Sequence, residues 1–549
     1  MQLIYLNKRT NIVKYKGKDV LNLCIYGSFE KYFDVNLSEY FNIIEPKKSL
    51  KFKEKYLKKI DTIAFELVSN KPNNKLAQVL SYRTFSKLAV SDNLVDKFWV
   101  IEQISSFTNP ELIIFVDDFD IYNLYSSGRI KFRFSEFVPY KLFYYFIIFL
   151  YNKIRASQYI CKPNINNNFK LFVGNNFEVK KNTDSIYDEY FFSKYWKNHS
   201  NAFLLLNIGE WNPKIEIEKE LLFKESFLSF KDIFKILFTS LEHFYSPIQI
   251  VEYSIEDRLV NRNLCTDVKS GSFIDAYQNF YIYSNLLKIL INKKGKLIIP
   301  HEGRSYEKII CSVFENTPIS VTGYAHFPVS ERILNYYYGK FESVIYNKFT
   351  FYTLSLNNFI QFKDLYKWPI YKFSIGAHLK FKPFKTLKGN NKSFDILILL
   401  GNELNQNIKL LTFVKNSLKN ENYKVLVRLH PSSRGLDYLE QLFLKFNFFR
   451  IQQNTLSEDV ELSKIIVYGD TGAAIDCLNF NVPLCYVNDD NCLLSDRIFE
   501  AIDGHYRFYD FNEFNSHLPS LLKKNITISY ESIRQKYISS LNPNSFSFE

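Results

Sequence analysis

Two segments in the C-terminal part of the chain constrain its fold more than any others. Each is a run of branched apolar residues that passes directly into a polar loop, the first from Lys424 to His430 and the second from Lys464 to Asp476. Short, unbroken apolar runs of this kind are typical of strands buried on both faces of a parallel sheet. In open α/β sheets, ligands bind outside the carboxyl ends of such strands. We therefore expect the two loops to share one ligand.

The residues after the first of these strands are suited to a phosphate group. His430 can donate a hydrogen bond to a phosphate oxygen, and Pro431, followed by Ser432, ends the strand. Arg428 lies two residues before His430, on the same face if the strand persists, where it either supports the site or pairs with a core carboxylate. For His430 the simpler alternative is a role in capping the turn.

The loop after the second strand has the features of an anion site at a helix start. Thr471 and Gly472 stand where free backbone N–H groups and a hydroxyl can hold a phosphate, and Asp476 follows five residues after Thr471, where a carboxylate can accept hydrogen bonds from ribose hydroxyls. An ordinary helix N-cap at Thr471 and Gly472, with an exposed Asp476, is the alternative.

A third strand belongs to the same region. The run 394–400, apolar except at Asp395, leads into Gly401 and Asn402, and a glycine there lets the backbone approach a ligand closely. The spaced glycines of a dinucleotide-binding fingerprint and the Gly-Lys-Ser/Thr phosphate loop are both missing from the sequence. NAD-dependent and ATP-driven chemistry are therefore not indicated.

Together these motifs resemble a known family. A strand ending in His-Pro, a second strand with a threonine turn, and an acidic residue in the next helix are similar to the C-terminal domain of GT-B glycosyltransferases that use cytidine-activated donors in bacterial surface polysaccharide synthesis. The resemblance covers roughly 395–487. It implies an α/β fold of two Rossmann-like domains facing a central cleft, with no cofactor and no metal. It implies that the donor contacts Arg428, His430, Pro431, Ser432, Gly401, Asn402, Thr471, Gly472 and Asp476.

By resemblance, the donor is a CMP-activated nonulosonic acid of the sialic acid or Kdo type. The acceptor is then a capsule, O-antigen or lipooligosaccharide glycan, free or lipid-linked. Transfer of a CDP-alditol, such as CDP-glycerol or CDP-ribitol, or of a UDP- or GDP-sugar, is an alternative of the same class. A non-catalytic scaffold with this fold, in a glycan assembly complex, is an alternative of another class.

An upstream region, 295–308 and 319–328, resembles the end of the N-terminal domain of the same enzymes. Glu302 follows an apolar strand and is the first candidate for the base that deprotonates the acceptor hydroxyl. Arg304, Glu307 and His326 are expected beside the acceptor, and His430 is also counted as catalytic because it can neutralise the departing phosphate.

A second acidic candidate follows the apolar run 112–116. Asp117 and Asp118 occupy a position like that of Glu302 and are the alternative bases. The neighbouring Asp118 and Asp120 have the Asp-x-Asp spacing of enzymes that bind a nucleotide through a divalent ion, which leaves a metal-dependent alternative. For all these carboxylates, a salt bridge or a helix cap is the simpler explanation.

The distribution of apolar runs predicts the domain organisation. Strands expected at 21–26, 62–67, 112–116, 203–208 and 297–300 alternate with helices, which favours a parallel sheet with helices on its faces. The boundaries that follow are an N-terminal domain over 1–375 with an insertion at about 123–200, a linker over 376–392, a C-terminal domain over 393–525 and a tail over 526–549.

Composition limits the partners. The formal charge of +13 favours anionic partners, such as phosphorylated donors or a membrane surface, or reflects a preference for lysine on the surface. No nucleic-acid motif is present, so nucleic acid is not expected. The seven cysteines are scattered and the N-terminus lacks a secretory signal, which predicts a cytoplasmic protein. The aromatic run 142–151 is too short to span a bilayer; a buried helix is favoured over peripheral contact with the inner membrane.

Overall fold

The computed structural model describes the following residues: 2–5, 21–24, 42–44, 50–69, 75–85, 94–107, 113–116, 118–127, 140–157, 165–174, 178–179, 186–187, 192, 196–208, 220–245, 250, 252–269, 271, 273–326, 329, 334–377, 379, 392–401, 404–418, 423–430, 449–451, 455–487, 496, 498, 504–523, 530–538, 546 and 548.

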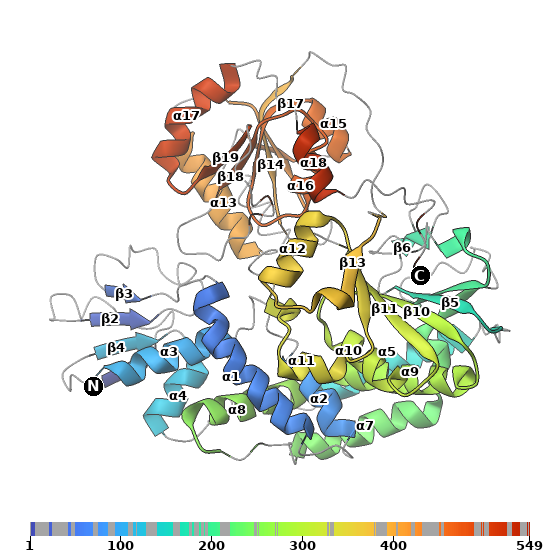
Figure 1. The fold of residues 1–549 in the computed structure, drawn as a ribbon. Coiled ribbons are helices and arrows are strands. Elements are labelled where there is room, and N and C mark those ends of the chain that lie inside the picture. Colours follow the sequence, from blue (N-terminus) through green and yellow to red (C-terminus); the bar gives the residue numbers. More distant parts are fainter. Residues whose placement is uncertain are drawn as a thin grey trace.

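A small parallel sheet stands at the start of the chain. Its strand order is β1-β4-β2-β3; α4 packs against β1 and β4, whereas α2 packs against α9 (Ile274–Leu290) and α10 (Ser305–Phe314) of the larger part (Figure 1). The elements are β1 (Gln2–Tyr5), β2 (Leu21–Cys24), β3 (Asn42–Ile44), α1 (Leu50–Ser69), α2 (Lys75–Phe85), α3 (Leu94–Ser106), β4 (Ile113–Val116) and α4 (Phe119–Ser127).

A larger, seven-stranded parallel sheet follows, with the order β13-β12-β11-β10-β5-β8-β9. The first strand in the chain, β5, lies between β8 and β10, so the strand order reverses between β5 and β10. This is the doubly wound order of a Rossmann-like sheet with one extra strand. The strands are β5 (Phe169–Val173), β8 (Ala202–Leu206), β9 (Leu221–Phe223), β10 (Gly295–Pro300), β11 (Ile319–Tyr324), β12 (Thr350–Thr353) and β13 (Phe373–Ile375).

The helices of this part connect the strands and cover the sheet. They are α5 (Tyr140–Ser157), α7 (Phe230–Tyr245), α8 (Ile255–Lys269), α9 (Ile274–Leu290), α10 (Ser305–Phe314), α11 (Lys340–Ile345) and α12 (Leu356–Asp364). Short 3-10 helices are η5 (Trp196–Asn198), η6 (Lys224–Phe227), η7 (Leu334–Tyr336) and η8 (Ile370–Lys372), and a two-stranded antiparallel ladder joins β6 (Glu178–Val179) to β7 (Ile186–Tyr187).

The C-terminal sheet has six parallel strands in the order β16-β15-β14-β17-β18-β19. In chain order this is 3-2-1-4-5-6, the Rossmann order, with its reversal between β14 and β17. The elements are β14 (Phe394–Leu399), α13 (Leu404–Ser417), β15 (Val425–Arg428), β16 (Phe449–Ile451), α15 (Leu456–Glu461), β17 (Ser463–Tyr468), α16 (Ala473–Cys477), β18 (Leu484–Val487), β19 (His505–Phe508), α17 (Phe511–Lys523) and α18 (Glu531–Tyr537). The prediction of an α/β fold with two Rossmann-like parallel sheets is confirmed.

Burial explains why these strands read as unbroken apolar runs. Along β14, Ile396 and Ile398 face one apolar cluster, while Leu397 and Leu399 face another on the opposite side of the sheet. Successive side chains of a strand point to opposite faces, so a sheet covered by helices on both sides needs an apolar residue at every position.

Three details of the predicted organisation are wrong. The expected strand at 62–67 lies inside α1, where Leu57, Ile60, Ala64 and Leu67 are buried at helical spacing. The expected strands at 21–26 and 112–116 belong to the small first sheet rather than the large one. The segment 123–200, predicted as an insertion, supplies β5, which lies between β10 and β8 in the large sheet.

The C-terminal tail joins the two large sheets. Tyr530, Tyr537 and Ile538 at α18 pack into the C-terminal core, and α18 also packs against α12 (Figure 1). Phe548 then lies in the other domain, in the apolar cluster with Phe172 on β5. The domain boundaries drawn from the sequence stay predictions.

Candidate functional site

The strand order identifies two candidate positions for a ligand. In doubly wound sheets, ligands bind at the carboxyl ends of the strands where the order reverses. In the C-terminal sheet these are the ends of β14 and β17, which lead into Gly401 and Gly469. In the large N-terminal sheet they are the ends of β5 and β10, and β10 leads into Glu302. Residues predicted from the sequence stand at both.

In the C-terminal sheet, Gly401 brings the two loops into close contact. A Cβ atom at Gly401 would lie 2.3 Å from the carbonyl oxygen of Asp470, so only glycine fits. Asn407 on α13 holds this loop: the Gly401 N–H donates to Asn407 Oδ1 at 2.8 Å, and Asn407 Nδ2 donates to the Gly401 carbonyl at 2.9 Å. The close approach at Gly401 is therefore between two protein loops, and the predicted approach to a ligand stays a prediction.

Arg428 and His430 lie at the end of the neighbouring strand, β15. Both are partly buried. Arg428 Nη1 is 2.7 Å from Oδ2 of Asp459, which is fully buried. Of the two roles considered for Arg428, the structure shows the pairing with a core carboxylate. The pair fixes the end of β15, and so the base of the loop that begins with His430.

The turn after β17 leads into a short helix where one was expected. Thr471 is buried, and its hydroxyl accepts a hydrogen bond from the Ala473 N–H at 3.4 Å. Gly472 is the N-cap of α16, which is only five residues long, and Asp476 is partly buried on it. Thr471 thus has a local capping role here. Four further candidates lie outside the described residues: Asp117, Asn402, Pro431 and Ser432.

In the N-terminal domain, the loop after β10 gathers three of the predicted acceptor-side residues. Glu302 is 4% exposed; its Oε2 lies 2.6 Å from Arg304 Nε, and its Oε1 lies 3.5 Å from His326 Nε2. The side chain of Arg304 is about half exposed and that of His326 mostly buried. His326 follows β11, the neighbour of β10, so two adjacent strand ends build this cluster.

The fourth candidate, Glu307, has a different position from the one predicted. It is fully buried, and its carboxylate accepts hydrogen bonds from the N–H groups of Glu302 at 2.7 Å, Gly303 at 3.1 Å and Arg304 at 3.1 Å. Its Oε2 also lies 2.8 Å from Nδ1 of His301. Glu307 therefore shapes the loop that carries Glu302 and does not face an acceptor.

The buried pair of Lys308 and Glu342 also supports this loop. Gly303 has φ +70°, and a Cβ there would lie 2.2 Å from the carbonyl oxygen of Asn335, so glycine is required. Lys308 Nζ donates to the Gly303 carbonyl at 2.9 Å and lies 3.9 Å from Glu342. Burial lowers the pKa of Lys308 and raises that of Glu342 to about 7, with each charge partly offsetting the effect on the other.

His301 anchors the start of the loop in the core. It is fully buried, and aromatic rings surround it, with Phe351 nearest at 4.4 Å between ring centroids. Tyr336 donates a hydrogen bond to the His301 carbonyl at 2.7 Å. The Nδ1 atom and the carbonyl of this histidine are thus used by the fold, whereas its Nε2 atom is buried without a hydrogen-bond partner among the described residues.

Asp118 and Asp120, the Asp-x-Asp pair, form a helix cap and salt bridges, which was the simpler of the roles considered for them. Asp118 Oδ1 accepts the N–H groups of Asp120 and Ile121 at 2.9 Å, which caps α4. Lys97 lies 3.2 Å from Asp118, and Arg262 lies 3.0 Å from Asp120. Within the described ranges, no group of three or more histidine, cysteine and acidic side chains is placed to hold a metal ion.

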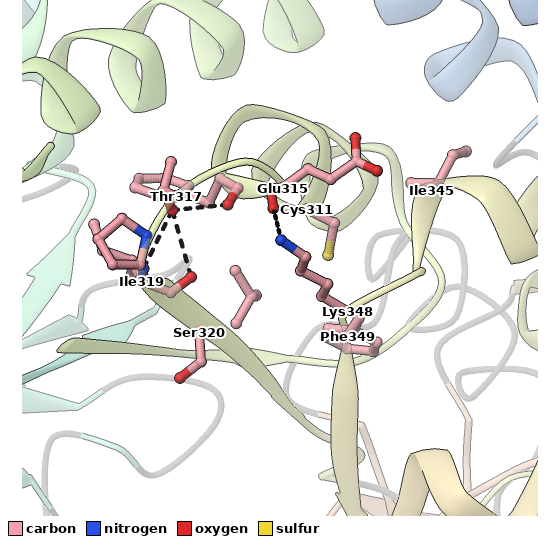
Figure 2. Close-up of a pocket in the computed structure, with 11 residues that line it drawn as sticks. Cys311, Glu315, Thr317, Ile319, Ser320, Ile345, Lys348 and Phe349 are labelled. Atoms are coloured by element: carbon pink, nitrogen blue, oxygen red, sulfur yellow. Dashed lines mark hydrogen bonds between the residues drawn. The ribbon is translucent and has the colours of Figure 1, made fainter. Parts of the chain in front are cut away.

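A pocket of about 150 Å³ lies at the amino end of β11 in the seven-stranded sheet (Figure 2). Ile319 at the start of β11 lines it together with Cys311 and Phe349, and Lys348 donates to the Glu315 carbonyl at its rim. Because it adjoins the amino end of β11, this pocket is separate from both candidate positions.

In the comparisons with known proteins, the chain is similar to solved structures only. No protein-family model matches the chain, and no curated protein matches it. TarM of S. aureus is similar at 14% identity over 48% of this chain and 56% of its own, with a TM-score of 0.35. The pneumococcal O-GlcNAc transferase GtfA, solved with UDP and GlcNAc, is similar at 11% over 47% and 54%, with a TM-score of 0.33. A glycosyltransferase from Rickettsia africae is similar at 12% over 68% and 93%, with a TM-score of 0.39. The chain spans just over half the length of the first two proteins.

Proposed function

We propose that the chain is a glycosyltransferase that moves a sugar from a nucleotide-activated donor to a glycan acceptor. One observation carries the proposal. Two parallel sheets of Rossmann order each place predicted site residues at the strand ends where the order reverses, with Gly401 and the Asp470 loop in one sheet and Glu302 in the other. A donor and an acceptor would then each have a site of their own.

The donor nucleotide is assigned to the C-terminal sheet. His430, at the end of β15, would donate a hydrogen bond to a donor phosphate, and the lack of a side chain at Gly401 lets the β14 and β17 loops lie in close contact. Arg428 contributes by holding the base of the His430 loop through Asp459. Neutralising the leaving phosphate is the part of the chemistry that this side supplies.

The acceptor is assigned to the loop after β10. In an inverting transfer, an oxygen of Glu302 removes the proton of the acceptor hydroxyl while that hydroxyl oxygen bonds to the anomeric carbon. The bond from the anomeric carbon to the donor phosphate breaks, and its electron pair leaves with the nucleotide. Arg304 and His326 hold the carboxylate of Glu302, and Arg304, the more exposed of the two, would meet the acceptor first.

The donor we propose is a CMP-activated nonulosonic acid, and the product a bacterial surface glycan built on the cytoplasmic side. This part rests on the resemblance of the segments 424–433 and 464–476 to cytidine-dependent transferases. A CDP-alditol, a UDP-sugar or a GDP-sugar as donor, and a scaffold without activity, are the outcomes to distinguish.

Thermal denaturation with CMP, CDP, UDP and GDP tests the donor class. We expect CMP to raise the melting temperature of the wild type, because a ligand that binds only the folded state stabilises it. His430→Ala should abolish that shift. His517→Ala, which removes an exposed histidine on α17, is the matched control and should keep it. A larger shift with UDP or GDP would indicate a UDP- or GDP-sugar as the donor. No shift with any nucleotide would favour the non-catalytic scaffold.

A further inference from the structure

The outer face of α5 is apolar along its whole length. Phe143, Tyr144, Ile147, Tyr151 and Ile154 are 46 to 63% exposed. Phe143 and Tyr144 are adjacent and the others follow at spacings of three to four residues, which places all five on one side of the helix. The sequence favoured a buried helix for 142–151, and for this face that prediction is wrong. No helix in the described parts of the chain is long and apolar enough to cross a membrane.

Helix α7 extends this apolar face. It packs beside α5, and the rings of Phe146 on α5 and Phe234 on α7 are 5.3 Å apart (Figure 1). Exposed aromatic side chains recur along α7 at positions 230, 234, 238 and 245, from 46 to 75% exposed. We name the two sets together the α5/α7 surface. The contact between Phe146 and Phe234 joins the two sets, and exposed apolar side chains gathered on two neighbouring helices indicate an interaction site.

The charges within the α5/α7 surface indicate the kind of partner. Lys231 and Lys235 are exposed and alternate with the phenylalanines of α7, and Arg155 lies 5.5 Å from the ring of Tyr151. The exposed acid of α7 is Glu242, near its end. Protein interfaces are depleted in lysine, whereas surfaces that bind lipid interleave aromatic side chains with lysines that reach anionic headgroups.

We propose that the α5/α7 surface docks the protein onto an anionic lipid bilayer. The aromatic and aliphatic side chains would enter the boundary between headgroups and acyl chains, and Lys231 and Lys235 would meet the lipid phosphates. The net charge of +13 supplies a further attraction to such a surface. This inference uses no residue of the proposed donor or acceptor sites, so it stands or falls separately from the proposed function.

Co-sedimentation with lipid vesicles tests the proposal. We expect the full chain to bind vesicles that contain phosphatidylglycerol and to bind pure phosphatidylcholine much more weakly. The double variant Lys231→Gln/Lys235→Gln should bind anionic vesicles roughly 30-fold more weakly, from about 1 kcal/mol for each lysine. Ile147→Ser/Phe238→Ser should weaken binding by at least about tenfold through lost apolar burial.

Matched controls lie on other surfaces. Tyr371→Ser removes a side chain that is 81% exposed on η8, and Lys415→Gln/Lys424→Gln removes two exposed charges from the C-terminal domain. Both should bind vesicles within about twofold of the wild type. Equal binding by all variants, or no vesicle binding by the wild type, would overturn the proposal. So would a dimer in sedimentation velocity that Ile147→Ser/Phe238→Ser dissociates, because the surface would then bind a second copy.

Discussion

Replacing Glu302 by glutamine should lower the rate of sugar transfer by about 100-fold or more, the range expected for loss of a general base. The carboxamide has nearly the shape of the carboxylate, so it can occupy the same buried position beside Arg304 and His326, but it cannot accept the acceptor proton. The measurement is kcat/KM for transfer, taken together with the Kd for CMP. The affinity for CMP should stay within about twofold, because the nucleotide is assigned to the other sheet.

The control for this variant is Glu315→Gln, at the end of the α10 helix that follows the Glu302 loop. It should transfer sugar at the wild-type rate. If Glu302→Gln keeps more than about a third of the activity, Glu302 is not the base. A parallel loss of CMP binding would instead place Glu302 in the donor site.

Replacing Glu307 by alanine should destabilise the protein by about 3 to 5 kcal/mol. The change leaves three backbone N–H groups, two of them buried, and the His301 ring nitrogen without their partner, and the loop that carries Glu302 loses its shape. Chemical denaturation followed by circular dichroism measures the loss. Transfer activity should fall as well, because Glu302 is held by that loop.

Glu307→Gln and Glu315→Ala separate the causes. The glutamine keeps one acceptor oxygen and should destabilise the protein less than the alanine. Glu315→Ala removes a carboxylate from the residue that directly follows α10 and should destabilise the protein by under about 1 kcal/mol. A loss below about 1 kcal/mol for Glu307→Ala would show that the four contacts do not organise the loop.

Much of the sheet architecture follows from the sequence because both faces of its strands are covered. The runs at 297–300, 396–399 and 465–468 are apolar at every position, and each lies in a strand of the structure. An apolar run alone does not identify a strand, however. The run at 62–67 belongs to α1, and the signal against a strand was the wider helical spacing of Leu57, Ile60, Ala64 and Leu67.

The predicted site residues divide according to whether their partners are local. Glu302 was expected at a strand end and stands there. For Glu307, the available signal was a helix-capping pattern, because it is the acidic third residue of α10. Asn407 and Asp459, which hold Gly401 and Arg428, were missed. Asn407 lies six residues after Gly401, whereas Asp459 comes from a helix 31 residues after Arg428, so only the second contact is distant in the sequence.

Hydrogen exchange with and without CMP tests the central claim most directly, that the nucleotide binds where the strand order of the C-terminal sheet reverses. Bound CMP should slow exchange in peptides that contain Gly401, His430 and the turn at 469–473, and leave peptides around Cys311 and Lys348 unchanged. Protection confined to the N-terminal sheet, or to the pocket at the amino end of β11, would contradict the account.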